Sequence, residues 1–165
     1  MTADCGRAHT ANGRSTAHDT FVIERTYDAT PARAFKAWAD PAAKARWFVG
    51  PPEWTLIERS LDFRVGGIEH LKGGFPGGRT SGFAARYLDI VPDRRILYVY
   101  DMRLTGTHIS SSLATVEFAP AGKGTRVRFT EQAVFVDGYD DCGSRERGTT
   151  ILLEQFGAHL AAHAV

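Results

Sequence analysis

The first part of the chain shows no hydrophobic pattern, and a clear alternation begins after it. Residues 1–19 mix glycine, small polar residues and charges, so burial there cannot offset the entropy lost on ordering. We predict a disordered N-terminal tail over 1–19 and a single domain over 20–165. Residues 20–28 alternate as a strand does, and one face of that strand holds Phe21, Ile23, Arg25 and Tyr27.

Two short helices should follow this strand. Thr30 before Pro31 is a helix start, because a threonine side chain caps the first turn and proline loses no hydrogen bond there. Asp40 and Pro41 repeat the signal, which predicts a second helix over 42–49. A glycine and two prolines then end it.

After residue 53 the sequence consists of short apolar runs separated by glycine and proline, which is typical of a strand meander. The predicted strands are 54–62, 67–72, 79–91, 94–105, 108–118 and 125–136. Apolar residues recur at three- and four-residue steps over 147–163, which predicts a long C-terminal helix.

The predicted order of elements defines the fold class. One strand, two short helices, six strands and a long helix give an α+β protein with its helices on one face of an antiparallel sheet. We expect a curved seven-stranded sheet wrapped around the C-terminal helix, which is the helix-grip layout. Glycines in the strands permit such curvature, and the curvature leaves space between sheet and helix.

Composition and charge narrow the function classes. The chain has 165 residues and a net charge of +1, so it lacks the basic excess of a general nucleic-acid surface. Its longest apolar runs are far shorter than the roughly 20 residues needed to span a bilayer. The N-terminus has no secretory-signal pattern, so we expect a cytoplasmic protein. Cys5 and Cys142 are too few for a disulfide framework and should be free thiols.

Four segments resemble successive signatures of one family. They are AWADPAAKARWF (37–48), FRVGG (63–67), YLDIVPDRRILY (87–98) and VEFAPAGKGTRVRFTEQ (116–132). In this order they resemble the activator-of-heat-shock-protein-ATPase homologues (AHSA-type) of the START-like (SRPBCC) superfamily, over residues 21–160. The resemblance implies a helix-grip fold with a deep, mostly apolar cavity. Many members open the last helix with a Gly-Trp pair, whereas here Thr149 follows Gly148.

The resemblance favours binding of a small hydrophobic or amphipathic molecule between the sheet and the C-terminal helix. We expect no cofactor and no metal, and a monomer or homodimer. The glycine-rich segment 73–82 lacks the ending of a phosphate-binding loop and should be a hairpin at the cavity mouth, with Phe75 as a gate. The candidate cavity residues are Trp54, Phe75, Phe83, Tyr87, Tyr98, Tyr100, Met102, His108, Phe118, Phe135, Phe156 and Leu160.

Arg25 is the most informative polar residue. Arg25 lies two residues from Ile23 and therefore on the same face of the strand. If that face is buried, the guanidinium needs a carboxylate partner or access to water, because an unpaired buried charge is costly. Glu131, on the strand expected beside the first, and Glu58 have inward parity and could form a polar cavity floor with it. We predict a structural pair of Arg25 and Glu131, with an acid/base or ligand-anchoring role as the alternative.

Two other functions stay open. The superfamily also contains enzymes of the cyclase, dehydratase and hydrolase kind, but the serines at 110–112 lack a GxSxG pattern, and His159 and His163 lack further ligands at zinc spacing. No catalytic constellation is evident, so an enzyme is uncertain. The third possibility is an interaction protein, a partner of a chaperone or of a transcriptional regulator, that uses charges on the outer sheet face.

Overall fold

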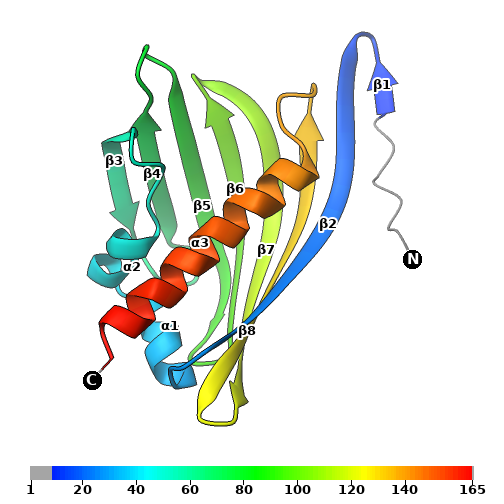
Figure 1. The fold of residues 1–165 in the computed structure, drawn as a ribbon. Helices are drawn as coiled ribbons and strands as arrows, with labels where there is room; N and C mark the ends of the chain where they lie inside the picture. Colours follow the sequence, from blue (N-terminus) through cyan, green and yellow to red (C-terminus); the bar gives the residue numbers. More distant parts are fainter. Residues whose placement is uncertain (1–8, 165) are drawn as a thin grey trace.

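Eight antiparallel strands form one curved sheet in the part of the chain that the structure describes, residues 9–164 of a computed structural model (Figure 1). The strand order across the sheet is β1-β2-β8-β7-β6-β5-β4-β3. The predicted α+β helix-grip fold is confirmed, with one strand more than expected. The strands are β1 (His9–Ala11), β2 (Arg14–Tyr27), β3 (Thr55–Leu61), β4 (Ile68–Gly74), β5 (Thr80–Val91), β6 (Arg95–Leu104), β7 (Thr107–Ala121) and β8 (Gly124–Val136).

The extra strand corrects the prediction of a disordered tail over 1–19. From His9 onward that segment is a hairpin, while residues 1–8 lie outside the described residues. Asn12 and Gly13 both have positive φ angles and join β1 to β2, which is the two-residue turn that an Asn-Gly pair favours. The backbone of β2 then pairs with β8 from Thr16 onward. Inter-strand hydrogen bonds therefore order this segment although it has few apolar side chains.

Three helices lie on the inner face of the sheet among the described residues: α1 (Pro31–Ala39), α2 (Pro41–Trp47) and α3 (Cys142–Ala162). Both predicted short helices are present, with the side chains of Thr30 and Asp40 as their caps, and α2 begins one residue before the predicted 42. Helix α3 starts one turn earlier than the predicted 147, because the Asp141 side chain accepts the backbone N–H of Ser144 at 2.9 Å. No described helix is long and apolar enough to cross a membrane.

The core sits where α1, α2 and the middle of α3 meet the sheet. Phe156 of α3 is 0% exposed, which confirms its predicted inward position. Its ring packs edge-on against Trp47 at 4.9 Å and Tyr27 at 5.2 Å, measured between ring centroids. Trp38 adds a contact at 5.6 Å. The short helices thus fill one end of the groove between sheet and α3, and Figure 1 shows α3 running diagonally across the concave face of the sheet.

Candidate functional site

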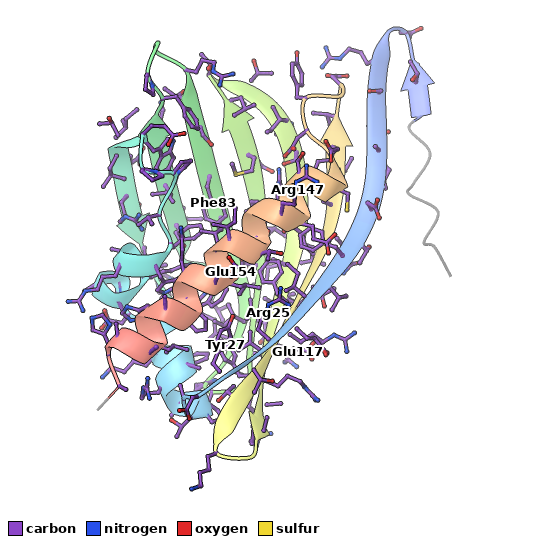
Figure 2. All side chains as sticks on the ribbon, viewed as in Figure 1. Arg25, Tyr27, Phe83, Glu117, Arg147 and Glu154 are labelled. Carbon is purple, nitrogen blue, oxygen red and sulfur yellow. The ribbon has the colours of Figure 1, made fainter. Side chains whose placement is uncertain are left out.

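A cavity of about 500 Å³ lies between α3, the segment that follows α2, and the inner face of the sheet. Its walls come from several elements because the curved sheet stands away from the helix beyond the packed core. Phe83 of β5, labelled in Figure 2, is one of these wall residues. Six of the predicted cavity residues line it: Trp54, Phe75, Phe83, Tyr98, Tyr100 and Met102.

The other six predicted cavity residues do not line the cavity. Phe118, Phe156 and Leu160 belong to the buried core at the end filled by the short helices. Phe135 is buried below the guanidinium of Arg145, at 5.3 Å from its ring. His108 contacts the hydroxyl of Ser111 at 2.9 Å instead. The alternation of inward and outward residues could not separate core positions from cavity positions. The placement of α1 and α2 decides which part of the groove is filled.

Tyr87 belongs to a buried ion-pair cluster beside the cavity. Its hydroxyl accepts a hydrogen bond from Lys44 of α2 at 3.1 Å. The Lys44 ammonium, in a residue that is 3% exposed, also donates to both carboxylate oxygens of Glu69 on β4, at 2.7 Å to Oε2. Burial lowers the pKa of Lys44, and the charge of Glu69 opposes that shift. Lys44 lines both the main cavity and a second one of about 310 Å³, which Glu69 and residues of β3 also line.

The predicted pair of Arg25 and Glu131 is wrong. The strands pair as expected, but Phe21 lies opposite Glu131 in the register and Arg25 lies opposite Val127. Arg25 is exposed and donates to the backbone carbonyl of Glu24 at 2.8 Å. The parity itself holds, since Phe21 and Ile23 are buried. In Figure 2, Arg25 lies on β2, a strand whose outer edge is unpaired beyond the short β1, so its long side chain reaches water.

Glu58 also fails as a part of the cavity floor. A β-bulge between Leu56 and Glu58 shifts the register of β3, and Glu58 then lies opposite the exposed Lys72. The carboxylate of Glu58 is 3.9 Å from the ring nitrogen Nδ1 of His70. The bulge therefore reverses the parity that the sequence pattern assumed for this residue.

Glu131 is a buried carboxylate as predicted, but its cation is Arg145 from the first turn of α3. Glu131 is 0% exposed, and its Oε1 accepts from Tyr100 at 2.6 Å, Ser112 at 2.8 Å and Arg145 at 3.2 Å. The Arg145 side chain is 10% exposed and also donates to Asp140 at 2.8 Å. We call Tyr100, Ser112, Glu131, Asp140 and Arg145 the Glu131 cluster. It bounds the cavity through Tyr100, Asp140 and Arg145.

Several polar atoms of the cavity wall have no hydrogen-bond partner among the described residues. They include the indole nitrogens of Trp38 and Trp54 and the side-chain oxygen of Gln155. The Tyr98 hydroxyl also makes no hydrogen bond within the described part of the chain. Burial raises the pKa of the Tyr98 phenol well above its usual range, so the hydroxyl stays protonated. The wall therefore presents neutral donors and an amide oxygen between apolar surfaces.

Four charged residues of the site were missed by the sequence analysis: Lys44, Glu69, Asp140 and Arg145. Lys44 lies one helical turn before Trp47, so the helical period could have placed it on the buried face. Glu69 shares strand parity with the buried Leu71. Arg145 had no such signal, because the predicted helix began after it. No described group of three or more His, Cys, Asp or Glu residues could hold a metal ion.

Comparisons with known proteins agree with this fold. The family model described as "Activator of Hsp90 ATPase homolog 1-like protein" matches residues 28–163. A putative uncharacterized protein from Rhizobium leguminosarum is 45% identical, with a TM-score of 0.87 over 91% of this chain and 99% of that chain. The Mll3558 protein from Rhizobium loti is 46% identical, with a TM-score of 0.82 over 88% of this chain and 99% of that chain.

A more distant structure shares the fold. An AHSA1-like protein from Aeromonas hydrophila is 22% identical, with a TM-score of 0.70 over 87% of this chain and 93% of that chain. No curated protein matches the sequence.

Proposed function

The chain belongs to the family of Activator of Hsp90 ATPase homolog 1-like proteins, and from its cavity we propose that it binds a small, largely apolar molecule between the sheet and α3. The observation that carries the proposal is the cavity of about 500 Å³ with mostly aromatic and aliphatic walls. Sites for small molecules are commonly concave and apolar, with volumes of about 300–1,000 Å³ and a few polar groups that orient the ligand.

The helix α3 supplies one wall of this cavity. Ser144, Gly148, Ile151 and Gln155 recur at steps of three and four residues and line it together. Gly148 is exposed at the cavity wall, and a Cβ atom added there would meet no atom within 4 Å. A larger side chain can therefore be introduced beside the cavity at this position without a clash.

The fluorescent dye N-phenyl-1-naphthylamine tests the proposal, because its emission rises in apolar surroundings. All three tryptophans of the chain, Trp38, Trp47 and Trp54, line the cavity and can transfer excitation energy to the bound dye. We expect the wild-type protein to bind the dye. Gly148→Phe should weaken binding at least about tenfold, which corresponds to 1.4 kcal/mol.

Ala158→Phe is the matched control, since Ala158 lies on the exposed face of the same helix. It should bind the dye as the wild type does. Thermal unfolding of both variants checks that they are folded. Two results would contradict the proposal: no binding of the dye by the folded wild type, or equal binding by Gly148→Phe and the wild type.

A further inference from the structure

A row of three tyrosines crosses the cavity side of β5 and β6. Tyr87 and Tyr98 lie opposite each other in the register, with ring centroids 5.7 Å apart. Tyr98 and Tyr100 share a face of β6, with ring centroids 5.9 Å apart. The Tyr87 hydroxyl contacts Lys44 and the Tyr100 hydroxyl contacts Glu131, whereas the hydroxyl of Tyr98, between them, makes no hydrogen bond within the described residues.

The charges around the cavity are already paired. Lys44 is held by both oxygens of Glu69, and Arg145 is held by Glu131 and Asp140. Three carboxylates thus face the two cations that line the cavity. Arg59 lines only the second cavity, where it donates to the backbone carbonyl of Phe48 at 2.7 Å. An anionic ligand would lose its hydration without gaining an unpaired cation, which is unfavourable.

The cavity groups that have no hydrogen-bond partner among the described residues are neutral. Tyr98 is 6% exposed, and its phenol keeps its proton as described above. The indole N–H of Trp54 lies on the same cavity wall, and a Cβ added at Gly73 would come within 1.9 Å of that indole ring, so the ring is closely seated on β4. The Tyr98 hydroxyl is not among the fully buried atoms without a partner, so it is reached from the cavity, and a ligand acceptor can form a hydrogen bond with it there.

We infer that the ligand is an uncharged, mainly apolar molecule with a hydrogen-bond acceptor, such as a carbonyl or ether oxygen, that accepts from the Tyr98 hydroxyl. This inference rests on the proposed function, because it assigns the ligand class of the same cavity. Tyr98 is then the residue that determines specificity for an acceptor group. The two ion-pair clusters exclude carboxylates of the same shape.

Three naphthalene derivatives of similar shape separate the effect of a hydrogen-bond acceptor on binding from the effect of a negative charge. They are 2-acetylnaphthalene, which carries a carbonyl, 2-ethylnaphthalene, which has no acceptor, and 2-naphthoate, which is anionic at pH 7.5. Their dissociation constants are measured by competition with N-phenyl-1-naphthylamine on the wild type and on Tyr98→Phe. Tyr139→Phe, at an exposed tyrosine, is the matched control. Tyr98→Phe removes only an unpaired hydroxyl and should fold as the wild type does.

We expect 2-acetylnaphthalene to bind the wild type at least about tenfold more tightly than 2-naphthoate does. Tyr98→Phe should weaken the ketone roughly 3- to 10-fold, as expected for the loss of one neutral hydrogen bond, and should leave 2-ethylnaphthalene unchanged. Tyr139→Phe should change neither value. This pattern of results would establish the ligand class.

The inference fails if 2-naphthoate binds as tightly as the ketone, if Tyr98→Phe leaves the ketone unaffected, or if the ketone does not displace the dye. In these cases dye binding that is blocked by Gly148→Phe still supports the proposed function. If the wild type does not bind the dye at all, both the function and the ligand class are overturned.

Discussion

Removal of the Arg145 guanidinium should destabilise the protein more than any surface substitution. Arg145→Met keeps most of the apolar length of the side chain but leaves the Glu131 carboxylate without its cation. Glu131 is fully buried, and its Oε2 already has no hydrogen-bond partner among the described residues. Breaking a buried ion pair on one side costs about 3–5 kcal/mol, because the remaining charge stays out of water.

A second substitution separates the cost of the unpaired Glu131 charge from the cost of the packing lost with the Arg145 side chain. Glu131→Gln keeps an oxygen that can accept from Tyr100 and Ser112 but removes the charge. The double variant should therefore recover at least about half of the stability lost in Arg145→Met, which gives a non-additive cycle. The hydroxyls keep their acceptor in the double variant, so the recovered part reports the unpaired charge.

Urea denaturation monitored by tryptophan fluorescence measures the free energy of unfolding of each variant. The thermal midpoint of Arg145→Met should fall by roughly 6–20 °C, at about 2–4 °C per kcal/mol for a protein of this size. Arg147→Met is the control, since Arg147 is exposed and, within the described residues, donates only to the Ser144 hydroxyl at 3.0 Å; it should cost less than about 0.5 kcal/mol. A loss below about 1 kcal/mol in Arg145→Met, or strict additivity in the cycle, would show that Arg145 does not stabilise the buried charge of Glu131.

Three further outcomes follow from the packing and the ionisation of the core. Phe156→Ala should lower the free energy of unfolding by about 3–5 kcal/mol in urea denaturation, because a fully buried ring leaves a cavity; a loss under about 1 kcal/mol would contradict its place in the core. Gly73→Ala should displace the Trp54 indole and reduce energy transfer to the dye, while Gly74→Ala, whose nearest contact would be 3.4 Å away, should not. Burial raises the pKa of Tyr27 to about 12, and an unfolded tyrosine ionises near 10, so the free energy of unfolding should fall as the pH rises from about 10 to 12. Urea titrations across this range should show a shallower fall in Tyr27→Phe, and an equal slope would contradict the assignment.

Local sequence patterns predicted the order of the elements from β2 to α3 and much of the core. Capping residues placed the starts of α1 and α2, because Thr30-Pro31 and Asp40-Pro41 act within one helical turn. Strand alternation placed Phe21 and Ile23 inside, and the helical period placed Phe156 inside. These signals are local, so neighbouring residues were enough to read them. The Asn12-Gly13 turn was equally local and could have been read from the sequence as a hairpin.

The contacts between inward-facing residues depend on how the elements pack in three dimensions. Glu131 pairs with Arg145 and not with Arg25. The register of β2 and β8 places Arg25 opposite Val127 and away from Glu131, whereas the crossing of α3 over the sheet brings Arg145 to 3.2 Å from Glu131. The bulge in β3 turned Glu58 outward, and the short helices determined which half of the groove is core and which half is cavity. Strand alternation predicts the face on which a residue lies, but burial and pairing also depend on how separate elements, such as β2 and β8 or α1 and α3, pack together. Those contacts are set by packing, which no local pattern encodes.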